Sequence, residues 1–180
     1  MNLPNRLSIL RVCCIPVLVV LLSLSEPWSR WAAAGVFAFA SFTDFLDGYL
    51  ARKNNWITVF GKFIDPVADK LLVLSTLVML TEIDLVPAWM VILILARELS
   101  VDGLRMIAIS HGKVIAAGPL GKIKTTSQMI LILLILCLYL PVFSFAAGII
   151  LGIWVCIITL WSGVDYFVRN RNLFSPDSSK

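Results

Sequence analysis

Long apolar runs constrain this chain more than any other feature of its sequence. Six segments each approach the roughly 20 residues that a helix needs to cross a bilayer. The chain is 59% hydrophobic with a mean hydropathy of +0.93, whereas an ordinary globular domain has about 45–50% apolar residues. We therefore expect an all-α integral membrane protein with a single domain over residues 1–180. The predicted helices span residues 8–25, 31–51, 59–80, 87–109, 121–140 and 144–167.

The first ten residues, MNLPNRLSIL, predict a short amphipathic segment on the membrane interface, ahead of the first helix. Arg6 and Arg11 precede LVVLLSLS in the manner of a signal peptide. However, no small-residue cleavage site follows, and Arg11 lies inside the apolar run. We expect this segment to be retained as a membrane helix.

Basic residues mark one side of the predicted bundle. They lie at both chain ends, in the link between the second and third helices, and around the link between the fourth and fifth: Arg6, Arg11, Arg52, Lys53, Lys62, Arg105, Lys113, Lys122, Lys124, Arg169, Arg171 and Lys180. The opposite links contain only Arg30. Because cytoplasmic loops are enriched in Lys and Arg, both termini are predicted to be cytoplasmic.

Four aspartates lie at this basic side, on the second and third predicted helices. Asp44 and Asp47 are three residues apart and Asp65 and Asp69 are four apart, so each pair shares one helix face. Carboxylates that converge in a place of low dielectric constant repel each other unless they are protonated, paired or bound to cations. Oxygen ligands without His or Cys favour Mg²⁺ or Mn²⁺, and four carboxylates suffice for two such ions.

A structural explanation remains open for any single aspartate, because Arg52, Lys62 or Lys70 could form an ion pair with it. Ion pairing explains the whole set poorly, since ionisable residues inside membrane segments are usually functional. Gly48 leaves space on the second helix, which could serve either close helix packing or the approach of a ligand. Arg52, one turn further, could bind a phosphate through two hydrogen bonds. These residues together suggest phosphate chemistry at the membrane surface.

Residues 44–69 read D-x2-D-G-x2-A-R-x8-G-x3-D-x3-D. This pattern resembles the signature of the CDP-alcohol phosphatidyltransferases, integral membrane enzymes of phospholipid synthesis, and the six-helix layout is also similar to that family's core. The resemblance implies that Asp44, Asp47 and Asp65 ligate the metal ions. It implies two roles for Asp69, as a metal ligand and as the catalytic general base.

The same resemblance implies a binding site for CDP-diacylglycerol. Gly48 and Arg52 are expected to contact the CDP moiety, and Thr58 to lie near the nucleotide. Asn5 and Ser8 belong to the segment PNRLSILR, which resembles the family's N-terminal nucleotide segment. Ser8 stands where many relatives have Thr, so the hydroxyl group is kept.

Two further segments, LARELSVDGLR (95–105) and GKIKTTSQM (121–129), resemble the phosphatidylglycerophosphate synthases within this family. Those enzymes transfer a phosphatidyl group from CDP-diacylglycerol to sn-glycerol 3-phosphate and release CMP. A dianionic acceptor needs cations, and the candidates are Arg97, Arg105, Lys122 and Lys124. Each could instead be a topology signal or part of an ion pair; for Arg97 the candidate partners are Glu98 and Asp102.

The resemblance also implies a homodimer in a bacterial-type inner membrane, with several spans, an active site facing the cytoplasm and no nucleic-acid partner. Two alternatives stay open. The acceptor could be phosphatidylglycerol, as in a cardiolipin synthase, or inositol phosphate or serine. Alternatively, the acids could serve a divalent cation transporter, although the far ends of the helices offer only Glu26, Glu82 and Asp84.

Overall fold

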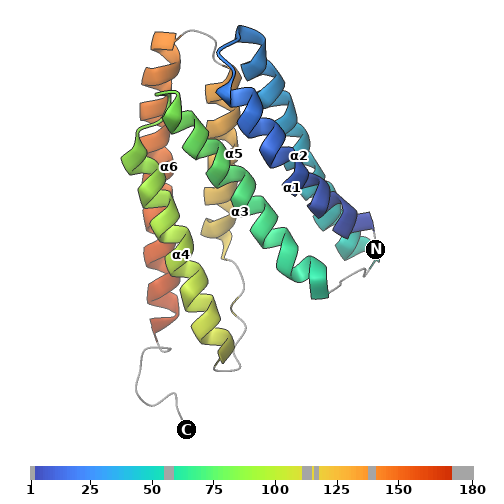
Figure 1. Ribbon diagram of the computed structural model, residues 1–180. Helices are drawn as coiled ribbons and strands as arrows, with labels where there is room; N and C mark the ends of the chain where they lie inside the picture. The colour runs from blue at the N-terminus through green and yellow to red at the C-terminus, as the bar shows by residue number, and fades with distance from the viewer. Residues whose placement is uncertain (1–2, 55–58, 111–114, 116–117, 138–140, 172–180) are drawn as a thin grey trace.

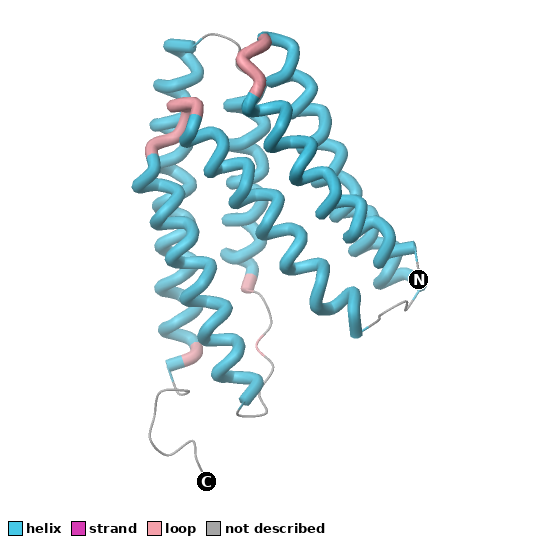
Figure 2. The backbone as a smooth tube through the Cα atoms, in the orientation of Figure 1, coloured by secondary structure: helices cyan, strands magenta, loops and turns pink. Residues whose placement is uncertain are grey.

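The protein is a bundle of α-helices, as the sequence predicts (Figure 2). The computed structural model describes residues 3–54, 59–110, 115, 118–137 and 141–171, with the side chains of 3–6, 45–54, 59–63, 66 and 141–147 left undescribed. These residues form six helices and, within the described ranges, no strand. The helices are α1 (Leu3–Ser23), α2 (Pro27–Asn54), α3 (Val59–Glu82), α4 (Ala88–Ser110), α5 (Pro119–Cys137) and α6 (Pro141–Arg169).

The clearest difference from the predicted helices lies at the N-terminus. The segment expected to form a separate interfacial element is continuous with α1, which starts at Leu3 and runs past Pro16 without a break. Pro4 is compatible with this start because a proline in the first helical turn lacks only an N–H that would have no helical partner. Proline also occupies the first position of α2, α5 and α6, so these helices begin two to four residues earlier than expected.

The helices pack as two groups of three that meet along the centre of the bundle. α1 packs against α2 and α3, while α6 packs against α4 and α5. Contacts of α2 with α5 and of α3 with α4 join the groups. Figure 1 shows α1 and α2 on one side of the molecule and α4 and α6 on the other. The core between them is apolar and includes the fully buried Phe37, Leu72, Leu77 and Ile132.

A tight turn at Asp84 connects α3 to α4 and fixes their relative position. Asp84 has a φ of 57°, a left-handed conformation that Asp tolerates better than most residues. The amide of Leu85 donates to the carbonyl of Leu80 at 2.9 Å, and the amide of Asp84 donates to that of Thr81 at 3.1 Å. This hydrogen-bond pair is a Schellman motif, which ends α3 with its last carbonyls satisfied.

The surface of the bundle is apolar and several of its charged residues are inside, which is the reverse of a soluble protein. Large side chains such as Trp31, Ile92 and Trp161 are more than half exposed, whereas Arg11 and Lys124 are buried. Within the described residues, two helical stretches are long and apolar enough to span a membrane, Pro119–Cys137 and Gly148–Arg169. α1 begins and α6 ends at the same end of the bundle (Figure 1).

Candidate active site

Two buried polar residues of α1 hold two of the predicted metal ligands. Ser8 and Arg11 are three residues apart, so they lie on one face of α1, and neither is accessible to solvent. The Arg11 Nη1 atom lies 2.8 Å from Asp44 Oδ1. The Ser8 hydroxyl donates a hydrogen bond to Asp65 Oδ1. Helix α1 thus orients one carboxylate from α2 and one from α3.

Asp44, Asp65 and Asp69, here called the acidic cluster, lie close enough for Asp44 to interact electrostatically with each of the other two. The Asp44 carboxylate repels that of Asp65 and that of Asp69. Asp69 Oδ1 is buried and has no hydrogen-bond partner among the described residues. The side chain of Asp47, the fourth predicted ligand, lies outside the described residues.

The donor chemistry of the acidic cluster suits a hard divalent cation. Mutual repulsion and a buried carboxylate oxygen without a partner are both relieved when a cation binds between the acids. The donors are carboxylate oxygens, which Mg²⁺ and Mn²⁺ prefer. Among the described residues, no group of three or more His, Cys, Asp or Glu side chains could hold a metal ion, so a site here would also need a ligand outside them, such as the predicted Asp47.

The predicted nucleotide contacts are described only in part. Gly48 and Arg52 lie in the C-terminal part of α2, and Asn5 lies in the first turn of α1. Nothing beyond the backbone is described at these three positions. Thr58 lies outside them altogether. Ser8 is described, and its hydroxyl contacts the acidic cluster at Asp65.

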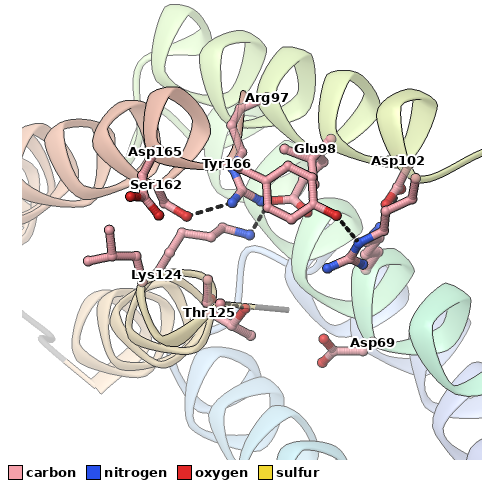
Figure 3. Close-up of a pocket in the computed structure, with 15 residues that line it drawn as sticks. Asp69, Arg97, Glu98, Asp102, Lys124, Thr125, Ser162, Asp165 and Tyr166 are labelled. Carbon is pink, nitrogen blue, oxygen red and sulfur yellow. Dashed lines mark hydrogen bonds and ion pairs between the residues drawn. The ribbon is translucent and has the colours of Figure 1, made fainter. Parts of the chain in front are cut away.

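A polar cavity of about 180 Å³ adjoins the acidic cluster, enclosed by α3, α4, α5 and α6. Asp69 lines it from α3, and Arg97, Arg105 and Lys124 line it from α4 and α5 (Figure 3). The structure therefore brings three of the predicted acceptor-binding cations to the predicted base. Lys122 is exposed and is not among the lining residues. Since residues two apart on a helix point about 200° away from each other, Lys122 and Lys124 cannot share this wall.

Glu98 links two of these cations inside the cavity wall. Its carboxylate pairs with the Lys124 ammonium group and lies 3.3 Å from Arg97 Nη1. The Arg97 Nη2 group also donates to the Ser162 hydroxyl at 2.6 Å (Figure 3). Glu98 thus pairs with two cations, so Glu98, Arg97 and Lys124 together carry one net positive charge. The predicted Arg97–Glu98 pair is confirmed, whereas Asp102 pairs with Lys70 of α3.

Arg105 has a different environment. Its Nε–H donates to the Tyr166 hydroxyl at 3.1 Å, and its guanidinium carbon lies 5.6 Å from the centre of the Tyr166 ring. Among the described residues, no acid forms an ion pair with Arg105 within 4.0 Å. The other acid of the cavity wall, Asp165, pairs with Arg169 at 2.8 Å. The paired groups therefore leave two positive charges beside Asp69, one of them on Arg105.

Two residues of this site, Ser162 and Tyr166, were not predicted from the sequence. Both are on α6 and buried, and they are separated from Arg97 and Arg105 by more than 60 positions of the chain. Both are polar residues in an otherwise apolar helix, and this sequence feature could have identified them. Buried polar groups need partners, and residues four apart share one helix face.

Comparison with known proteins shows which family the chain belongs to. Residues 1–161 match the family described as CDP-alcohol phosphatidyltransferase. The chain belongs to the CDP-alcohol phosphatidyltransferase family. This confirms the resemblance seen in the pattern of residues 44–69.

Curated relatives within the family match almost the whole chain. A protein of Bacillus subtilis (strain 168) is 43% identical, covering 94% of this chain and 95% of its own length. One from Escherichia coli (strain K12) is 39% identical with the same coverage, and one from Pseudomonas fluorescens is 40% identical, covering 92% and 88%. All three are named CDP-diacylglycerol–glycerol-3-phosphate 3-phosphatidyltransferase.

Proposed function

We propose that this phosphatidyltransferase moves the phosphatidyl group of CDP-diacylglycerol to sn-glycerol 3-phosphate, giving phosphatidylglycerophosphate and CMP. The observation that carries the proposal is the small polar cavity beside Asp69, with Arg97, Arg105 and Lys124 in its wall. The names of the curated relatives support the same reaction.

The cavity suits a small acceptor with a phosphate monoester. A monoester carries close to two negative charges at neutral pH, and the paired groups of the wall leave two positive charges. Serine has no phosphate to match them. The volume of about 180 Å³ lies below the roughly 300–1,000 Å³ of pockets for larger ligands, which disfavours inositol phosphate and the headgroup of a second lipid.

In this proposal Asp44, Asp47, Asp65 and Asp69 hold Mg²⁺ or Mn²⁺, with two ions as the expected number. Such ions, when bound, neutralise diphosphate charge and make CMP a better leaving group. Asn5, Ser8, Gly48, Arg52 and Thr58 bind the CDP moiety, as the family pattern implies. Arg11 fixes Asp44 by their 2.8 Å ion pair, so the carboxylate is oriented before the donor arrives.

Asp69 is the proposed general base. Its carboxylate interacts with Asp44 of the acidic cluster and with Lys124 of the cavity, so it stands between donor and acceptor. The acceptor hydroxyl oxygen attacks the phosphorus that bears the lipid, the bond from that phosphorus to the CMP oxygen breaks, and the hydroxyl proton passes to Asp69. General base catalysis requires the base to come within hydrogen-bond reach of the attacking hydroxyl, and the position of Asp69 in the cavity wall allows this.

We also propose that all six helices span a bacterial-type inner membrane, with both termini and the active site facing the cytoplasm. Exposed apolar side chains on every helix support this, for example Val17, Phe42, Val78, Ile92, Ile130 and Trp154. The acids of the site are at the end of the bundle that prediction assigns to the cytoplasm. A cation transporter would need acids along the whole membrane path, so we disfavour that alternative. A homodimer remains an expectation from the family, to be checked by light scattering in detergent.

An acceptor panel tests the proposal. The purified protein in detergent micelles would receive CDP-diacylglycerol, Mg²⁺ and one acceptor at a time, and CMP release and the lipid product would be measured. We expect efficient release with sn-glycerol 3-phosphate, none after chelation by EDTA, and recovery with excess Mg²⁺ or Mn²⁺. Efficient release with serine, inositol phosphate or phosphatidylglycerol and none with glycerol 3-phosphate would overturn the assignment of the acceptor.

A further inference from the structure

Helix α6 contributes two polar side chains to the cavity, and both contact arginines of α4. Ser162 and Tyr166 are one helical turn apart, with exposed fractions of 2% and 7%. Ser162 accepts a hydrogen bond from Arg97 Nη2 at 2.6 Å, and Tyr166 accepts one from Arg105 Nε at 3.1 Å. Figure 3 shows the contact between Ser162 and Arg97 as a dashed line, and a second dashed line starts at the Tyr166 hydroxyl.

The two arginines differ in what else holds them. Arg97 is also fixed by the carboxylate of Glu98 at 3.3 Å. Arg105 has the hydroxyl and the ring of Tyr166 as its partners among the described residues. A carboxylate in place of this phenol would orient Arg105 equally well, but it would cancel the arginine's charge and compete with a bound phosphate. A neutral phenol oxygen fixes the side chain and leaves the charge available.

The atoms involved in this contact matter as well. A guanidinium group has five N–H donors, and the terminal Nη1 and Nη2 groups carry four of them. Tyr166 accepts from Nε, so its hydrogen bond leaves the Nη1 and Nη2 groups as the pair that can bind two oxygens of a phosphate side by side. The ring of Tyr166 lies close to the guanidinium carbon, at 5.6 Å from its centroid, within the range of a cation–π contact.

We propose that Tyr166 is a positioning residue that sets the affinity of this enzyme for the phosphate of its acceptor, by holding Arg105 in the orientation that binds it. The proposal rests on the proposed function, in which the cavity takes a phosphate monoester. Arginine has many rotamers in its free state, and fixing one of them before the ligand binds raises affinity. Tyr166 affects the chemical step only through the binding of the acceptor.

The test is Tyr166→Phe, which removes the hydroxyl and keeps the ring. We expect KM for sn-glycerol 3-phosphate to rise about tenfold, the size of effect that follows from losing one hydrogen bond to a charged group. The kcat and the KM for CDP-diacylglycerol should stay within about twofold of the original enzyme. Inorganic phosphate, used as a competitive inhibitor against the acceptor, should lose affinity by the same factor as the acceptor.

Two comparisons separate positioning from a general loss of structure. Thr159→Val removes another buried hydroxyl of α6, one without a hydrogen-bond partner among the described residues, and should change none of these constants. In an Arg105→Lys background, where the Nε–H donor is gone, Tyr166→Phe should have no further effect, because the two residues act as one unit.

The outcomes are distinct. An unchanged KM in Tyr166→Phe, or an equal penalty in the Arg105→Lys background, would overturn the positioning role while the proposed function stands. Absence of CMP release from the original enzyme with glycerol 3-phosphate would overturn the proposed function, and the acceptor role of Tyr166 with it.

Discussion

Asp69 lies where the acidic cluster meets the polar cavity. It lines the cavity, its Oδ1 has no partner among the described residues, and it interacts with Asp44. We predict that Asp69→Asn lowers kcat at least about a hundredfold, the lower range for loss of a general base, while CDP-diacylglycerol still binds. The measurements are CMP release and donor binding by equilibrium filtration. Near-normal turnover in this variant would exclude Asp69 as the base.

The basic residues of α4 and α5 allow a second test at the residue scale. Arg105 faces the cavity with an unbalanced charge, whereas Lys122 is exposed and lies outside the lining. We predict that Arg105→Ala raises KM for glycerol 3-phosphate by about tenfold or more, since hydrogen bonds between charged groups are worth about 1.5–3 kcal/mol. Lys122→Ala should raise it much less. Equal effects of the two substitutions on KM would argue against the cavity as the acceptor site.

At the scale of the helices, the sequence predicts the elements well and their partners only in part. Helix period and i, i+4 spacing correctly bring Asp65 and Asp69 to one face of α3. Spacing along one helix is fixed by local geometry, so it can be read from the sequence. The contacts of Ser162 and Tyr166 depend on how α6 packs against α4, which is long-range information that no local pattern contains. The prediction that Lys122 and Lys124 act together could have been corrected from the sequence, because residues two apart on a helix point in nearly opposite directions.

The close packing of α6 against the turn between α3 and α4 gives a prediction about stability. A Cβ atom added at Gly148 would lie 2.5 Å from the backbone carbonyl oxygen of Leu85, in the turn that the left-handed Asp84 closes. Since that carbonyl is fixed by its turn, we predict that Gly148→Ala lowers stability by about 1–3 kcal/mol, as overpacking typically does. Thermal unfolding in detergent measures the change.

The control for Gly148→Ala is Gly35→Ala on α2, where an added Cβ meets nothing within 4 Å. Alanine favours helix more than glycine does by about 1 kcal/mol, so this variant should be as stable as the original protein or slightly more stable. A loss of stability in both variants would mean that the effect comes from helical glycines in general and that the contact with Leu85 is unimportant.

For the whole molecule, the fold gathers repelling carboxylates from α2 and α3 at one end of an otherwise apolar bundle. Assembling Asp44, Asp65 and Asp69 costs free energy in the absence of a cation, because each carboxylate raises the energy of its neighbours. A cation that binds only the folded protein stabilises it by mass action, about 2.7 kcal/mol at a concentration one hundred times its dissociation constant. Mg²⁺ or Mn²⁺ should therefore stabilise the protein without any substrate.

We predict that Asp65→Asn keeps or raises the stability of the metal-free protein and reduces the further stabilisation by metal. Without metal, removing one negative charge relieves the repulsion, while the amide oxygen can still accept the hydrogen bond from Ser8, so the variant should unfold at a temperature equal to or above that of the original protein. With Mg²⁺ or Mn²⁺ added, it should gain much less than the original protein gains. Glu26→Gln, at an exposed acid beyond α1, should leave the metal response unchanged. An equal metal-induced shift in all three proteins would show that the stabilisation does not arise at the acidic cluster.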